Sequence, residues 1–295
     1  MADPISVLVR RGGVTEAVHR VNAVAVQDGT VVAERGDGSL VAFMRSSAKP
    51  LQTLPVARAR EDLDDRDLAI ASASHLAGEA ALEAVRALLA KAPASADELE
   101  CGAEGHPPER IRHNCSGKHA GMLALCRTRG WPSAGYRLEG HPVQSTSLEE
   151  IAAAAEVPPG EIPSAVDGCG VLTFALPLER MAHAFARLEE LEAGARVAAG
   201  MRAYPELIRG PRAADTVLMQ ARAGWTAKGG AEGLMCATGP GGLGVAVKVE
   251  DGATRAVGPA LAAFLAELGH AVDELRVARL ENSLGEVVGE VVTEE

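Results

Sequence analysis

Residues 44–51, MRSSAKPL, place a serine and a lysine three positions apart, at Ser46 and Lys49. In a helix this spacing puts both side chains on one face, where a neutral lysine amine could accept the proton of the serine hydroxyl. A lysine of ordinary pKa is well under a thousandth neutral at pH 7, so a base at Lys49 requires burial or a second cation nearby. Because Ser-x-x-Lys also occurs on solvated helix faces, the pair indicates a nucleophile only if other groups support it.

Two further segments could supply those groups. Lys228, in TAKGGAEG, is followed by two glycines that let another backbone segment or a ligand approach closely. Ser74 and His75, in ASASHLAGE, precede the next predicted helix. Taken alone, Lys228 is typical of a turn and Ser74 of a helix cap.

A third group lies in HNCSGKHAGM and VDGCG, which contain Cys115, Lys118, His119, Asp167 and Cys169. Thiols, a histidine and a carboxylate are zinc ligand types, but C-x-x-C and H-x-x-x-H spacings are both absent. Flanking glycines place both thiols in loops or at helix starts, where thiolates are better supported than in a core. Spacing alone leaves metal binding and simple burial open; the remaining cysteines, Cys101, Cys126 and Cys236, are interpreted as structural.

Composition excludes several classes of protein. The chain has 295 residues, 47% of them hydrophobic and 3% aromatic, which indicates a folded protein with an aliphatic core. A net charge of −11 without a compensating basic run argues against nucleic acids and anionic membranes as partners. Five scattered cysteines argue against a secreted disulfide framework, and neither a signal peptide nor a long apolar run is present. We therefore expect a cytoplasmic protein.

The elements that must position these residues follow from the hydrophobic pattern. Strands are predicted in residues 1–45, including a hairpin around Asp28-Gly29, and again in residues 225–295. The middle, about 46–224, is predicted to be helical, and a further apolar helix follows late in the chain. The predicted helices cover residues 47–59, 78–92, 117–130, 147–157, 178–203 and 257–271. The sequence thus predicts a single α+β domain over residues 1–295, whose sheet comes from both ends of the chain.

Five segments together resemble one known family. In chain order, RSSAKPLQ, ASASHLAGE, HNCSGKHAGM, DGCGVLTFALPLERMA and AKGGAEGLMCATGPGGLGVAVKV are similar to the zinc-containing Ser-Lys L-asparaginases of the rhizobial type. The resemblance extends from about Val7 to the C-terminal helix. It implies a fold similar to serine β-lactamases and glutaminases, with an antiparallel sheet flanked by helices and an inserted helical region.

The resemblance also implies roles for particular residues. Ser46 would attack the side-chain amide carbon of asparagine, with Lys49 as its base. Ser74 and Lys228 would form a second Ser-Lys pair that relays protons and supplies the second cation. One zinc ion per chain would be bound by Cys115, Lys118 and Cys169. Positions near the substrate or the metal in the family correspond to Arg45, His119 and Asp167.

Other functions remain open at this point. A penicillin-recognising serine hydrolase or a glutaminase-like amidohydrolase could use the same fold, and a non-catalytic amino-acid-binding protein could have kept it. The chain is also shorter than typical family members between Cys169 and Lys228. A homodimer is expected from the family and from the alanine-rich segments IAAAAEV and ARVAAGM, which would allow close packing between subunits.

Overall fold

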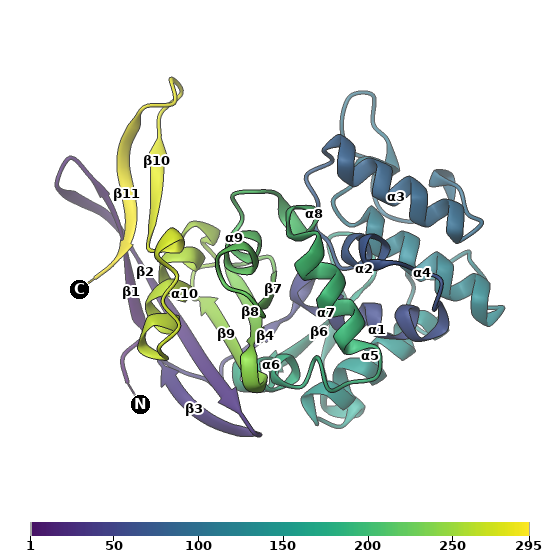
Figure 1. The fold of residues 1–295 in the computed structure, drawn as a ribbon, viewed down its shortest axis with the longest axis horizontal. Helices are drawn as coiled ribbons and strands as arrows, with labels where there is room; N and C mark the ends of the chain where they lie inside the picture. The colour runs from purple at the N-terminus through teal and green to yellow at the C-terminus, as the bar shows by residue number, and fades with distance from the viewer. Residues whose placement is uncertain (1, 295) are drawn as a thin grey trace.

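The main sheet is built from both ends of the chain, as the sequence predicts. The computed structural model describes residues 2–294. Within them, eight strands form an antiparallel sheet in the order β10-β11-β1-β2-β9-β8-β7, and β3 also pairs with β2 (Figure 1). The strands are β1 (Ile5–Arg11), β2 (Val14–Gln27), β3 (Thr30–Arg35), β7 (Thr226–Gly229), β8 (Leu234–Gly239), β9 (Leu243–Val249), β10 (Val277–Glu281) and β11 (Val287–Thr293).

The predicted hairpin at Asp28-Gly29 is confirmed. Strands β2 and β3 pair in antiparallel register up to Gln27 and Thr30, which leaves Asp28 and Gly29 as a two-residue turn. Both turn residues have positive φ angles, 49° and 72°, as a type I′ turn requires. Asp and Gly tolerate this backbone conformation better than other residues, so the local sequence determines the register of this part of the sheet.

Helices cover the sheet and form the inserted region. Helix α6 packs against β2, β8 and β9, and α10 contacts β1, β9 and β11. Other helices gather beside the sheet (Figure 1). The helices are α1 (Lys49–Ala59), α2 (Asp65–Ala71), α3 (Glu79–Lys91), α4 (Ser116–Arg129), α5 (Pro142–Ala155), α6 (Leu178–Ala186), α7 (Gly194–Ala203), α8 (Pro205–Arg209), α9 (Ala214–Ala221) and α10 (Val257–Glu267).

The middle of the chain is an inserted helical region, as predicted, but it differs from the prediction in two details. A small second sheet pairs β4 (Val41–Phe43) and β5 (Ser164–Val166) with β6 (Leu172–Pro177), whose four central residues are buried. The predicted helix over 178–203 is divided into α6 and α7. Ala193 has a left-handed φ of 66°, and a Cβ atom on Gly194 would lie 1.7 Å from the Leu188 carbonyl oxygen, so the chain turns here at a close backbone contact.

The alanine-rich segments expected at a subunit interface are used inside the chain instead. In α5, Ile151 and Ala154 are fully buried, and in α7, Val197 and Ala198 are fully buried. Helix α5 packs against α1 and α6, and α7 packs against α2. These segments are therefore core elements, and they do not support the expected homodimer.

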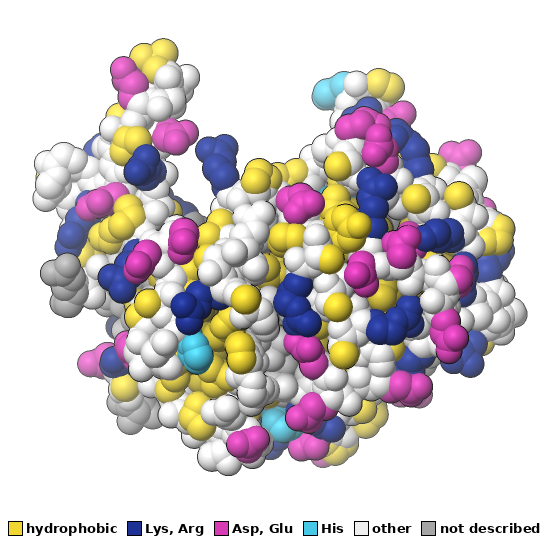
Figure 2. All heavy atoms as spheres, viewed as in Figure 1, with side chains coloured by type: hydrophobic (Ala, Val, Ile, Leu, Met, Phe, Trp, Pro, Cys, Tyr) yellow, Lys and Arg dark blue, Asp and Glu magenta, His cyan; other side chains and the backbone are white. Residues whose placement is uncertain are grey.

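Charged side chains of both signs are distributed over the surface (Figure 2). Figure 2 shows acidic and basic side chains interspersed over one face, without an extended patch of either sign. Among residues 2–294, the helices are too short or too polar to cross a membrane.

Candidate active site

Ser46 lies at the junction between the small sheet and α1, as predicted. After β4, a 3-10 turn over Arg45–Ala48 leads directly into α1 at Lys49. Arg45 has a φ of 50°, an unfavourable region for a residue with a side chain, and its N–H donates to Thr173 Oγ1 at 3.0 Å. The backbone before Ser46 is thus held in a specific strained conformation. The Ser46 hydroxyl is partly exposed and has no hydrogen-bond partner within residues 2–294.

Lys49, from the first predicted Ser-Lys pair, contacts Ser74, from the second. Its side chain is fully buried, and Nζ donates to Ser74 Oγ at 2.8 Å and to the Ala73 carbonyl oxygen at 2.5 Å. Burial is the main cause that lowers the Lys49 pKa, and the charge of Lys118 lowers it further against the opposing effect of nearby thiolates. Burial, the first condition that the sequence sets for a lysine base, is met; the cation that lowers the Lys49 pKa is Lys118 and not the expected Lys228, and it acts only while Lys118 keeps its proton.

Lys228 lies on edge strand β7 and has an acidic partner. Its Nζ is 3.7 Å from Asp215 Oδ2, and both side chains are fully buried. Asp215 Oδ2 also accepts the Gly229 N–H at 3.0 Å, and Lys228 Nζ donates to the Gly229 carbonyl at 2.7 Å. Burial lowers the Lys228 pKa to about 7, although Asp215 opposes the shift; the charges of Lys49 and Arg209 add to it. This lysine therefore changes its charge near neutral pH.

Asp215 is a functional candidate that the sequence does not reveal. It is a lone carboxylate on α9, in the segment RAADT, and no spacing relates it to Lys228. Only the packing of α9 against β7 brings the two together.

Cys115, Lys118 and Cys169 converge at the start of α4. A Cβ atom on Gly117 would lie 2.1 Å from the Ile70 carbonyl oxygen, so this glycine allows α4 to begin directly against α2. Lys118 and both thiols are buried, and Lys118 Nζ donates to Cys169 Sγ at 3.2 Å.

The charges of these groups depend on one another. A hydrogen bond from Cys169 and the positive charges of Lys49 and Lys118 lower the Cys115 pKa well below its usual value, against the effect of burial. Burial acts to lower the Lys118 pKa, but the negative charges of Cys169, Cys115 and Asp167 outweigh it and raise the pKa. The cluster thus favours a thiolate beside an ammonium group.

The three residues fit zinc in chemistry, and the distance between two of them is close to that of a zinc site. Within residues 2–294, His, Cys, Asp and Glu side chains do not form groups of three or more suited to a metal, so a site here depends on Lys118. Tetrahedral Zn–S and Zn–N bonds separate two ligand atoms by roughly 3.6 Å. The 3.2 Å between Lys118 Nζ and Cys169 Sγ is within a few tenths of an ångström of that value. Lys118 would have to lose its proton to bind the metal.

Arg45 and Asp167 form an ion pair beside this cluster. Arg45 Nε is 2.5 Å from Asp167 Oδ1, with 27% and 9% of the two side chains exposed. Although burial opposes the shift, the charges of Lys118 and Arg45 hold the Asp167 pKa below its ordinary value. The pair presents both signs of charge close to Ser46.

His119 is held in one orientation by Tyr136. Its Nδ1 is 2.7 Å from Tyr136 Oη, which accepts the Glu100 N–H at 2.8 Å. The buried phenol proton needs an acceptor, so Tyr136 donates to Nδ1 and the proton of the neutral imidazole lies on Nε2. Burial is the main cause that lowers the His119 pKa to about 4. Nε2 lacks a hydrogen-bond partner within residues 2–294, and Cys169 is close enough to oppose the pKa shift.

His75 ties the Ser74 loop to the Cys115 loop. Its Nδ1 accepts the Ala77 N–H at 3.1 Å, so Nε2 carries the proton and donates to Ser116 Oγ at 2.8 Å. Its own backbone N–H donates to the Asn114 carbonyl. The two loops are therefore fixed relative to each other.

The other three cysteines are buried apart from these contacts. Burial raises the pKa values of Cys101 and Cys236 to about 12 and that of Cys126 to about 11. Such thiols stay protonated and unreactive, in agreement with a structural role.

Comparison with known proteins identifies the family. The family model for L-asparaginase II matches residues 7–293. A search of curated proteins finds no significant sequence match. Because the family match covers nearly the whole chain, this protein belongs to the L-asparaginase II family, a family of amidohydrolases.

Proposed function

We propose that this protein hydrolyses L-asparagine to L-aspartate and ammonia, with Ser46 as the nucleophile. Family membership supports the substrate and the reaction class. The observation that carries the assignment of residues is the 2.8 Å hydrogen bond from Lys49 Nζ to Ser74 Oγ. It links Lys49 of one pair to Ser74 of the other in a buried contact, and Ser46, three residues before Lys49, is partly exposed.

In the first step, Ser46 Oγ forms a bond to the side-chain amide carbon of asparagine. Neutral Lys49 accepts the hydroxyl proton, and the amide nitrogen leaves as ammonia after receiving a proton from the lysine cluster. Water then hydrolyses the resulting aspartyl ester, with the same cluster as base. The strained backbone at Arg45 supports this role, because strain of this kind concentrates at functional sites.

Ser74 and Lys228 would complete the proton relay. Ser74 Oγ accepts from Lys49, so its own hydroxyl proton is free to move toward another group. Lys228 is about half neutral at neutral pH because its pKa is about 7, which suits a group that takes up and returns protons. The charge of Lys49 disfavours the charged form of Lys228, so Lys228 tends to be neutral when Lys49 holds a proton.

Cys115, Lys118 and Cys169 would hold one zinc ion and leave one coordination position free. When bound, zinc supplies a Lewis acid that attracts a substrate oxygen. The Arg45–Asp167 pair supports binding of a substrate that carries both a carboxylate and an ammonium group. His119, through its Nε2–H, would orient the Cys169 sulfur, and Tyr136 would set the required tautomer.

Product formation from a substrate panel tests the proposed function. We expect ammonia from asparagine, much less from glutamine, and no turnover of nitrocefin or a D-Ala-D-Ala peptide. Turnover of nitrocefin without asparagine would instead assign a penicillin-recognising hydrolase. Asparagine binding in calorimetry without ammonia release would indicate a binding protein.

A further inference from the structure

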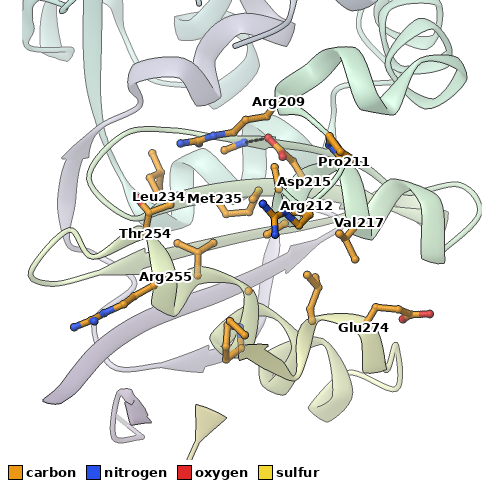
Figure 3. Close-up of a pocket in the computed structure, with 18 of the residues that line it drawn as sticks. Arg209, Pro211, Arg212, Asp215, Val217, Leu234, Met235, Thr254, Arg255 and Glu274 are labelled. Carbon is orange, nitrogen blue, oxygen red and sulfur yellow. Dashed lines mark hydrogen bonds between the residues drawn. The ribbon is translucent and has the colours of Figure 1, made fainter. Parts of the chain in front are cut away.

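A cavity lies beside the Lys228–Asp215 pair. It has a volume of about 410 Å³ and lies between α9, the adjacent ends of β7 and β8, the start of α10 and the start of β10 (Figure 3). Ser46 and Lys49 are not among its lining residues. Its size is within the range of small-molecule sites. The wall is mainly apolar and includes Val217, Leu234, Met235, Val257 and Leu275.

Two arginines that line this cavity have few or no acidic partners within the protein. Arg209 makes neither a hydrogen bond nor an ion pair through its side chain within residues 2–294. Arg212 has one acidic neighbour at the limit of an ion pair, Glu281 at 4.0 Å, and 90% of its side chain is exposed. In a chain with a net charge of −11, such available guanidinium groups indicate an external anion.

The other charged groups of the lining leave this positive character in place. Arg255 Nε donates to His19 Nε2 at 3.0 Å, and Glu274 extends outward from the cavity (Figure 3). Asp215 accepts the Gly229 N–H and lies 3.7 Å from Lys228 Nζ, and it makes no ion pair with Arg209 or Arg212 within residues 2–294. The cavity therefore combines an apolar wall with a cationic edge.

We propose that this cavity binds a small molecule with a carboxylate head and an apolar body. Arg209 and Arg212 contact the carboxylate, which matches the planar fork of a guanidinium group, and the apolar body lies against the side chains of α9, β8 and α10. The cavity adjoins the proposed asparagine site, because Asp215 and Gly229 line it and also contact Lys228; calorimetry measures its occupancy directly, without asparagine hydrolysis.

Calorimetry with three small molecules separates the contribution of the carboxylate head to binding from that of the apolar body. Octanoate carries both head and body, acetate only the head, and octanol only the body. We expect one octanoate per chain, bound at least about tenfold more tightly than either acetate or octanol, since one charge-assisted contact is worth about 1.4 kcal/mol or more. Equal affinity for octanol and octanoate, or no octanoate binding, would overturn the proposal.

Substitutions of lining residues test whether octanoate binds in this cavity. Arg209→Gln and Arg212→Gln should each weaken octanoate binding about tenfold and leave octanol unchanged, whereas Arg86→Gln, an exposed arginine on α3, should have no effect. Gly258 lines the cavity, and a Cβ atom there would lie 3.6 Å from its nearest neighbour, an ordinary contact distance. A leucine side chain at this position therefore fits the backbone and should occupy the cavity, so Gly258→Leu should block octanoate. Octanoate binding unchanged in both arginine variants refutes the site even if Gly258→Leu does not fold.

Discussion

The substitution Asp215→Asn tests whether Lys228 takes part in catalysis through its neutral form. Asp215 is the acidic neighbour that raises the Lys228 pKa, and it opposes burial, which brings that pKa down to about 7. A lysine of ordinary pKa, 10.5, is roughly 0.03% neutral at pH 7, whereas one with a pKa of about 7 is about half neutral. Activity that needs neutral Lys228 should therefore fall as the pH drops below about 7.

The size of the effect follows from the distance between the charges. At 3.7 Å and an effective dielectric constant of about 20, the attraction between Lys228 and Asp215 is about 4.5 kcal/mol, equivalent to about 3 pH units. Carboxylate neighbours shift pKa values by about 1 to 3 units in proteins. The asparagine introduced by Asp215→Asn keeps the shape of the side chain without its charge, so the acidic limb of the rate profile should move down by about 1 to 3 pH units.

The assay is the pH dependence of kcat/KM for ammonia release, measured for the natural protein and for each variant under the same buffer conditions. Arg209→Gln is the matched control, because loss of a positive charge should move the acidic limb upward instead. Thermal denaturation confirms that each variant is folded. An acidic limb that does not move in Asp215→Asn, or that moves upward, would refute a role for neutral Lys228.

Three further predictions concern the surroundings of the site. Tyr136→Phe removes the donor to His119 Nδ1 and should lower kcat/KM about 10- to 100-fold, with a change in the His119 ¹⁵N chemical shifts that report its tautomer; unchanged shifts would contradict the relay. Protein purified without chelators should contain one zinc per chain, and Cys115→Ser and Cys169→Ser should each lose it. Metal affinity should fall as pH drops, because the thiols and Lys118 must lose protons to bind zinc. Metal-free protein with full activity would leave the cysteines as packing residues. The expectation of a homodimer now rests on the family alone, because the alanine-rich segments lie in the core, and light scattering that shows a stable monomer at micromolar concentration would reject it.

Local signals account for the parts of the fold that the sequence predicts correctly. The Asp28-Gly29 turn needs two positive φ angles that these residues adopt readily, and the start of α1 follows from a strand, a short turn and Pro50 in the first helical turn. The break after α6 depends instead on a contact between Gly194 and the Leu188 carbonyl, which periodicity does not report.

The residues of the site, like the elements of the fold, are predictable from the sequence only where a local pattern marks them. Serines, lysines and cysteines in five ordered segments are recognisable from their types and order. Asp215 and Tyr136 are single residues whose roles come from tertiary contacts, one across the α9–β7 packing and one across a loop to α4. The three-stranded sheet escapes prediction because β4 and β6, which pair at residues 41–43 and 175–177, are far apart in the sequence.

The most direct test of the central claim is a double-mutant cycle on Ser46 and Lys49, read out as the rate of ammonia release from asparagine. Ser46→Ala and Lys49→Met should each lower kcat by about 10³-fold or more, and the double variant should be little worse than either single one, because the two residues act as a unit. Ser145→Ala, an exposed serine on α5, should retain full activity. Additive losses, or a Ser46→Ala variant within a few-fold of the natural protein, would contradict the assignment of the nucleophile and its base.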